Sequence, residues 1–170
     1  MTPKEKFDYF GAIMTSSQDV YNLYSEIGDR KLELIKEQNA KELEEIGQRY
    51  DRETSMVQAA LGAGIISQEA AQEAEDRLRK KKIDKENIAN KKLFEAQKKR
   101  DKEDAIFQGL SSTASAISQA FANSPNPIAA AIFASISAAA IAAATAANIS
   151  AISKHKFVPQ TYADGGIIEG

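Results

Sequence analysis

Few residues in this sequence could do chemistry, and none stands in a catalytic spacing. His155 is the only histidine and lies between Lys154 and Lys156, and cysteine is absent. The many serines have no base at a fixed spacing, whereas a serine nucleophile needs a base within hydrogen-bond reach. We therefore expect His155 to be solvated near the end of a helix, where a positive charge is favourable.

The glycines and acidic residues likewise fit no cofactor or metal site. Gly62 and Gly64, and Gly165 and Gly166 further along, lack the strand-to-helix context and the Lys-Ser/Thr pair of a phosphate-binding loop. Without cysteine, disulfide bonds and thiolate metal sites are excluded. No pair of acidic residues stands beside apolar residues that could form a pocket. The sequence thus predicts no catalytic residue, no cofactor and no metal, and we expect a protein that is not an enzyme.

Charge divides the chain into two contrasting parts. No Asp, Glu, Lys, Arg or His lies between Asp104 and Lys154, and only four charged residues follow Asp104. The net charge of −2 over 170 residues offers no basic field for nucleic acid. Alanine supplies much of the hydrophobic fraction and tryptophan is absent, so a large single core is not expected. We predict instead an elongated all-α protein that buries surface mainly by forming homo-oligomers.

The charged part has the apolar spacing of long helices. We expect an N-terminal helix over residues 1–17, where Thr15-Ser16-Ser17 leaves open either a break or a continuous helix. The three-four spacing of apolar residues then continues. It predicts a charged helical hairpin, the stalk, over residues 18–104.

The turn of the stalk is predicted at residues 62–67. Gly62 and Gly64 can take the left-handed conformation that ends helices, and Ser67 can cap the next helix. The helix after the turn is rich in Lys and Arg, while the facing stretch, residues 26–53, holds nine acidic against six basic residues. Antiparallel pairing would bring these opposite charges together, although each exposed pair contributes only ~0.2–1 kcal/mol.

The same basic helix also suggests an alternative function, that of a nucleic-acid-binding coiled coil. Acidic residues interleave with the basic ones between Arg77 and Lys102, and only Phe94 could stack on a base. The pattern therefore favours a solvated pairing face, and nucleic acid is not expected as a specific partner.

Residues 105–153 are predicted to form a second, uncharged hairpin rich in alanine. Pro125 and Pro127 lie in its turn at residues 123–127, because proline disrupts a helix interior and suits a first helical position. The first arm carries an apolar heptad seam of Phe107, Leu110, Ala114, Ile117 and Phe121. The second arm has a small residue at every fourth position: Ala130, Ala134, Ala138, Ala142, Ala146 and Ser150. Such a helix-packing ridge lets another helix approach closely.

Two environments are open for the uncharged hairpin. Its second arm, residues 128–153, is long enough to span a bilayer, which takes ~20 apolar residues. Both arms nevertheless hold many Ser, Thr, Asn and Gln residues, and alanine favours insertion only weakly. The composition therefore favours close packing in a soluble assembly, and leaves both constitutive and conditional membrane insertion open.

Residues 154–170 are predicted to be an irregular tail with a turn at Asp164-Gly165-Gly166. The order of all these features resembles the C-terminal region of phage tail tape measure proteins and related prophage tail proteins. The resemblance covers residues 30–170 and is most specific at residues 147–157 (ANISAISKHKF) and residues 162–168 (YADGGII). Residues 64–71 (GIISQEAA), the charged helix and the hairpin broken by proline match in the same order.

This resemblance implies an elongated helical oligomer inside the virion tail, which templates tail assembly and leaves with the genome, its apolar helices aiding passage across the host envelope. Tape measure proteins are far longer, because their helix length sets tail length, whereas a stalk of roughly 45–55 residues spans only about 70–80 Å. A short tail-interior or ejected protein, or a fragment of a longer one, fits better. We expect a structural virion component whose partners are copies of itself and other tail proteins. The alternative is a membrane-inserting helical hairpin that aids genome passage across the host envelope.

Overall fold

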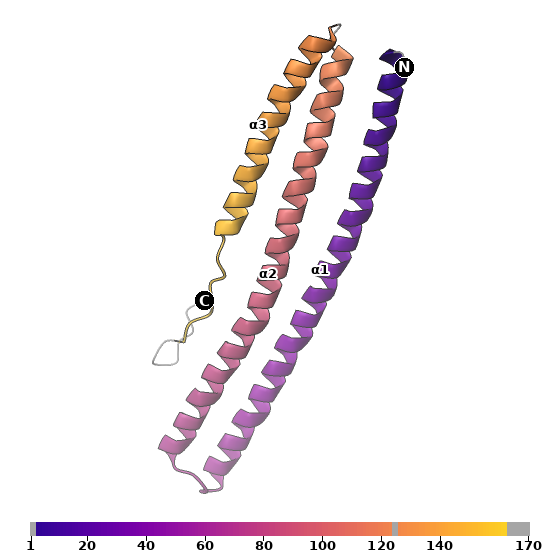
Figure 1. Ribbon diagram of the computed structural model, residues 1–170. Helices are drawn as coiled ribbons and strands as arrows, with labels where there is room; N and C mark the ends of the chain where they lie inside the picture. Colours follow the sequence, from indigo (N-terminus) through magenta and orange to yellow (C-terminus); the bar gives the residue numbers. More distant parts are fainter. Residues whose placement is uncertain (1–2, 124–125, 163–170) are drawn as a thin grey trace. The chain divides into compact units, whose positions relative to one another are not determined.

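The structure, a computed structural model, describes the backbone of residues 3–123 and 126–162 (Figure 1), and within these ranges the side chains from residue 18 onward except that of Pro127. Three helices account for the regular structure there: α1 (Pro3–Gly62), α2 (Gln68–Asn123) and α3 (Pro127–Lys154). The all-α class predicted from the sequence is confirmed for these residues. Residues 155–162 are not helical, as expected for the start of the tail.

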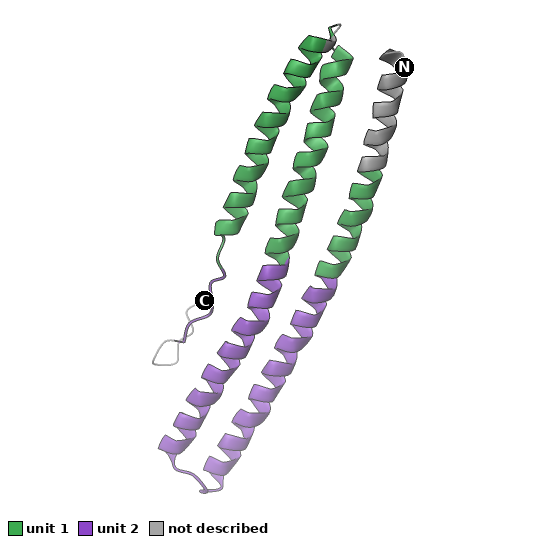
Figure 2. Ribbon diagram, in the orientation of Figure 1, with its two compact units in different colours: residues 1–32, 97–156 green, residues 33–96, 157–170 purple. Residues whose placement is uncertain are grey.

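The helices contribute to two compact units (Figure 2). Unit 1 comprises residues 1–32 and 97–156, and unit 2 comprises residues 33–96 and 157–170. The sequence changes in composition after Asp104, where the charged residues end, and its heptad pattern predicted one helix running through that point. α2 passes through that point without a break, because a change in side-chain polarity does not interrupt the backbone hydrogen bonds of a helix.

α1 is continuous through residues 15–17, so of the two possibilities left open by the sequence the continuous helix is the one found, and the expected N-terminal helix is the first part of α1. No glycine or proline lies between Gly11 and Gly28. Serine and threonine lower helix stability by less than ~1 kcal/mol per residue in a helix interior. A run of three such residues therefore does not break a helix that the longer flanking segments favour.

The turn between α1 and α2 is a Schellman motif. The Ile65 N–H donates to the Ala60 carbonyl at 2.9 Å and the Gly64 N–H to the Leu61 carbonyl at 3.0 Å. Gly64 has a φ of 72°, which confirms its predicted left-handed conformation, whereas Gly62 remains the last residue of α1. Ser67 Oγ then accepts from the Ala70 N–H at 3.2 Å, so the predicted cap of α2 is confirmed.

The turn before α3 also follows local side-chain chemistry. Asn126 Oδ1 accepts from the Ile128 N–H at 2.9 Å, and Pro127 is the first residue of α3, as its fixed φ favours. Pro125 and the turn expected at Asp164-Gly165-Gly166 lie outside the described residues.

In unit 2, α1 and α2 run antiparallel and share a thin core. Glu53 pairs with Lys81 at 3.8 Å and Glu42 with Lys92 at 3.9 Å, so the partners descend along α1 as they ascend along α2. The buried apolar side chains described in this unit are Ala71, Ile83 and Ala89. Since two of the three are alanines, little apolar area is buried per residue, as the composition predicted.

In unit 1, segments of all three helices supply the core. Its buried apolar side chains, among the described residues, are Leu32, Ala130 and Ala134. The rings of Tyr21 and Tyr24 in α1 lie 5.2 and 4.7 Å from the ring of Phe107 in α2, in tilted arrangements. Such tilted pairs stabilise the fold by more than the apolar area they bury accounts for. They join α1 to α2 in this unit.

Candidate functional site

α3 presents two opposite faces of different exposure in unit 1. Ala130 and Ala134 are buried. Four bulky apolar side chains are 55–71% exposed, and we call them the outer face of α3: Ile128, Ile132, Phe133 and Ile136. At about 100° of rotation per residue, the three isoleucines lie on the opposite side of the helix from the buried alanines, and Phe133 lies at the edge of that side. The outer face is the candidate functional site, because a group of exposed large apolar side chains marks a surface for a partner or for lipid.

The predicted helix-packing ridge is divided between the two faces of α3. Ala130 and Ala134 are buried and Ala138 is half-buried. The exposed members are Ala142, Ala146 and Ser150. A step of four residues advances about 400° around a helix of 3.6 residues per turn, so the ridge drifts about 40° at each step. The inner contact continues through half-buried residues at other positions: Ile141, Thr145, Ile149 and Ile152.

α2 and α3 approach closely at Gly109, a residue that the sequence analysis missed. A Cβ at position 109 would lie 2.8 Å from Thr145 Cγ2 and 3.0 Å from Thr145 Cβ, so only glycine leaves room for this threonine. A helix-interior glycine costs ~1 kcal/mol relative to alanine. The lone glycine of this long apolar stretch was therefore an available signal for close helix packing.

The predicted heptad seam of α2 is likewise split between contact and exposure. Phe107 packs on two tyrosines of α1, and Ala114 and Ile117 are half-buried. Leu110 and Phe121 are 61% and 46% exposed. A heptad seam serves one partner helix, whereas this part of α2 contacts both α1 and α3 within unit 1. The exposed members add to the apolar surface of the unit.

Arg100 is a buried charge inside unit 1. Its side chain is 5% exposed. The guanidinium donates to Asp29 Oδ1 at 3.0 Å, to the Ser25 carbonyl at 3.1 Å and to Ser25 Oγ at 2.8 Å, and it also pairs with Asp104. Burial acts to lower the pKa of Arg100, but the hydrogen bond to Asp29 and the charges of both aspartates outweigh it, so the pKa is raised. The side chain stays charged and hydrogen-bonded.

Gly28 makes room for this guanidinium. A Cβ at position 28 would lie 2.7 Å from Arg100 Nε and 3.1 Å from Arg100 Cδ. The sequence contained both residues of this contact, a glycine in a helix interior and an arginine in the charged helix after the turn of the stalk. It did not reveal that the two residues meet.

The C-terminal end of α3 is capped by a lysine of α2. Lys98 Nζ donates to the carbonyl of Ser153 at 2.9 Å and to that of His155 at 2.7 Å. A helix leaves its last carbonyls without intrahelical partners, and its dipole favours a cation there. His155 is exposed directly after Lys154, the last residue of α3, which confirms the solvated helix-end position expected for it.

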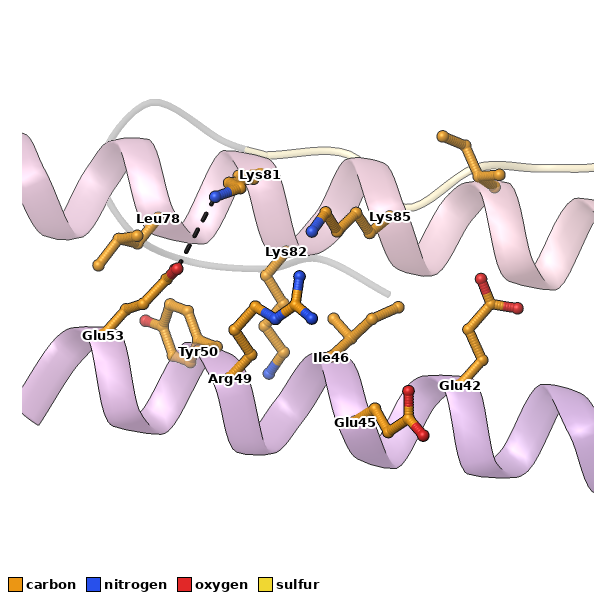
Figure 3. A pocket seen from close by; sticks show the side chains of 11 residues that line it. Glu42, Glu45, Ile46, Arg49, Tyr50, Glu53, Leu78, Lys81, Lys82 and Lys85 are labelled. Atoms are coloured by element: carbon orange, nitrogen blue, oxygen red, sulfur yellow. Dashed lines mark ion pairs between the residues drawn. The ribbon is translucent and has the colours of Figure 1, made fainter.

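A groove in unit 2 has walls of mixed charge (Figure 3). Its lining residues are Glu42, Glu45, Ile46, Arg49, Tyr50, Glu53, Leu78, Lys81, Lys82, Lys85 and Ile88. Lys82 Nζ lies 4.9 Å from the Tyr50 ring centroid and pairs with Glu86 at 3.7 Å. Carboxylates among the lining residues would repel phosphates, so the groove does not favour nucleic acid. No group of three or more His, Asp or Glu residues in the described part of the chain could hold a metal ion.

By length and composition, α3 could cross a membrane. Residues Ile128–Lys154 form a 27-residue segment with a mean hydropathy of 2.0, and 11% of its most apolar part is buried. Comparison of the chain with protein families, with curated proteins and with solved structures found no match. The features of the chain that bear on function are therefore its sequence pattern and the outer face of α3.

Proposed function

We propose that this chain is a structural component of a phage particle, similar to a tail tape measure protein, that self-associates through its helices in the tail interior. The observation that carries the proposal is the outer face of α3, whose four large apolar side chains are 55–71% exposed. The resemblance over residues 30–170 supports a place in the tail. The role is structural and not enzymatic, and the partners are copies of the chain and other tail proteins.

In this proposal an elongated helical hairpin over residues 18–122, which includes the stalk, holds the oligomer together. The uncharged arms line the axis of the oligomer or face the tail tube. Burying one Ile or Phe side chain contributes about 1.5–3 kcal/mol, so covering the outer face of α3 in each copy favours assembly strongly. The exposed small residues Ala142, Ala146 and Ser150 allow neighbouring helices to approach closely.

Sedimentation analysis of the whole chain tests this self-association. Ile136→Glu places a charge on the outer face, and Met56→Glu places the same charge on exposed surface in unit 2. Both parent side chains are well exposed, at 62% and 71%, so neither substitution disturbs the packing of a single chain. We expect an oligomer for the wild type and for Met56→Glu at micromolar concentrations, and a shift toward monomer for Ile136→Glu.

A wild-type chain that sediments as a monomer, or an Ile136→Glu variant that assembles as the wild type does, overturns the proposal. The place of the chain in a virion has its own test. Mass spectrometry of purified tail particles should detect the chain at several copies per particle. Its absence from such particles removes the tail assignment even if the chain self-associates.

A second candidate function, insertion into the host membrane during genome passage, is favoured by the hydropathy and exposure of α3. A 27-residue helix is about 40 Å long, which exceeds the ~30 Å hydrocarbon thickness of a bilayer. Lys154 is its last residue and Lys156 follows shortly after, as basic residues near a membrane surface do. Flotation with liposomes tests insertion: binding by the wild type that Ile136→Glu abolishes supports it. Binding that this charge leaves unchanged, or no binding, removes it.

A further inference from the structure

The segment that follows α3 is not helical and contacts α2 within unit 2. We call residues 157–162 the strap. At its start, the ring of Phe157 lies 5.9 Å from the ring of Phe94, tilted by 55°. This aromatic pair anchors the strap where it leaves the linker after α3.

The middle of the strap is held through its backbone. Asn87 Nδ2 donates to the Gln160 carbonyl at 3.0 Å, and the Gln160 N–H donates to Asn87 Oδ1 at 2.8 Å. One side-chain amide therefore satisfies both polar backbone groups of a single residue, as a neighbouring β-strand would. Such a two-point bond fixes the position of the strap along α2 independently of the side chain at Gln160.

The end of the strap is held through a tyrosine. The Tyr162 hydroxyl donates to Asp76 Oδ1 at 2.9 Å. The Lys80 ammonium and the Arg79 guanidinium lie 5.2 and 5.9 Å from the centroid of its ring, within the range of cation–π attraction. Two aromatic side chains and one backbone clamp thus tie the strap to α2 at three places.

We propose that the strap is a latch, and that its detachment from α2 is the step that frees the C-terminal end of α3. Only His155 and Lys156 separate Lys154, the last residue of α3, from Phe157. While the strap is attached, this short linker limits the movement of the helix end. When the strap detaches, only the contacts of α3 within unit 1, including the two bonds from Lys98, hold that end.

The contacts of the strap suit a latch because they are specific but shallow. They are made by side chains at the helix surface, and Val158 between the anchors is 83% exposed. The strap can therefore detach without unfolding α2, since it contributes no buried core residue. The latch proposal rests on the proposed function in one respect. It assumes that a freed α3 presents its apolar faces to other copies of the chain or to lipid.

Amide hydrogen exchange and limited proteolysis of the whole chain test whether the strap is held. Asn87→Ala removes the backbone clamp, and Asn22→Ala makes the same change at an exposed position of unit 1, whereas the strap belongs to unit 2. We expect the amide hydrogen of Gln160 to exchange on the order of tenfold faster in the Asn87→Ala variant than in the wild type. Trypsin should also cleave the variant faster after Lys156. Asn22→Ala should match the wild type. No protection of the strap in the wild type, or no effect of Asn87→Ala, overturns the latch.

A reversible lock tests whether the strap controls α3. The chain has no cysteine, so Asn87→Cys combined with Gln160→Cys can form only one intramolecular disulfide, at the position of the backbone clamp. We expect amides of residues 149–154 to exchange several-fold more slowly in the oxidised than in the reduced form of this variant. Equal exchange in both forms, or no disulfide, overturns the proposal.

The same pair of samples separates the latch from the proposed function. If locking slows exchange in α3 and also suppresses assembly or liposome binding, both proposals stand. If locking slows exchange but neither form assembles nor binds liposomes, the latch stands and the proposed function fails.

Discussion

At the contact between Gly28 and Arg100, the substitution Gly28→Ala has two opposing effects on stability. Gly28→Ala raises intrinsic helix stability by ~1 kcal/mol. The new Cβ would, however, lie 2.7 Å from the Nε of a guanidinium held by Asp29 and Ser25. Moving the guanidinium weakens the pairing of a buried charge. We expect Gly28→Ala to lower the free energy of unfolding by about 1–3 kcal/mol, measured by chemical denaturation followed by circular dichroism.

Gly47 supplies the matched control in the same helix. A Cβ at position 47 would meet no atom within 4 Å, so Gly47→Ala should show the propensity gain alone and raise the free energy of unfolding by up to ~1 kcal/mol. If both substitutions stabilise the chain equally, the buried Arg100 contact does not restrict position 28.

The phenol of Tyr162 gives a pH-dependent prediction. Its hydrogen bond to Asp76, together with burial and the charge of Asp76, raises the pKa of Tyr162 above the usual ~10, while Arg79 acts to lower it. Folding therefore stabilises the neutral phenol. This contribution is complete below pH ~10 and is lost as pH rises through the raised pKa.

Strap contacts through Tyr162 should accordingly persist at neutral pH and weaken only in strongly alkaline solution. Titration of tyrosinate by ultraviolet absorbance checks this prediction, because Tyr162→Phe should remove a component that titrates above the ordinary range. Loss of a component with an ordinary pKa would show that the hydroxyl is not bonded to Asp76.

At the scale of elements, the packing of α3 on α2 depends on Gly109 facing Thr145. Gly109→Ala adds a Cβ 2.8 Å from Thr145 Cγ2, and we expect it to lower the free energy of unfolding by about 1–3 kcal/mol. Thr145→Ala removes Cγ2, the atom that the new Cβ would meet. In the double variant the loss should therefore be partly recovered, with a coupling energy of about 0.5–3 kcal/mol in a double-mutant cycle. If the stability effects of the two substitutions are strictly additive, residues 109 and 145 are not in contact.

Helix ends were predictable from the sequence because local residues decide them. The Schellman turn at Gly64, the Ser67 cap and the Asn126-Pro127 start each depend on side chains within a few positions of the backbone groups they satisfy. The overall helical class followed from apolar periodicity in the same way.

Contacts between helices were predictable only in part. Opposite charges correctly placed Lys81 and Lys92 against acidic residues of α1. The helix-packing ridge, from Ala130 to Ser150, was traced by a repeat of four, and its outward drift depends on the difference between four and 3.6 residues per turn. The roles of Lys98 and Arg100 depend on which residues of other helices lie opposite them, which no single-helix pattern encodes.

At the scale of the whole molecule, exposed apolar side chains occur on every helix of unit 1. Besides the outer face of α3, they include Val20 and Leu23 of α1 and Ile106 and Leu110 of α2. The exposed apolar residues of α2 and α3 named here lie in the uncharged stretch after Asp104, whereas the cross-helix ion pairs of Glu53 with Lys81 and of Glu42 with Lys92 lie in unit 2. We therefore expect unit 1 to supply the interface of an assembly.

Salt separates an apolar interface from a charged one. If assembly buries the outer face of α3, raising sodium chloride from about 0.05 M to about 1 M screens charge without weakening the contact, and sulfate should strengthen it. The sedimenting mass should stay constant or rise. A nucleic-acid-binding role through the basic residues of α2 predicts the reverse for a DNA complex, because affinity falls steeply as salt displaces phosphate contacts. An oligomer that dissociates at high salt would instead place the interface on the charged helices.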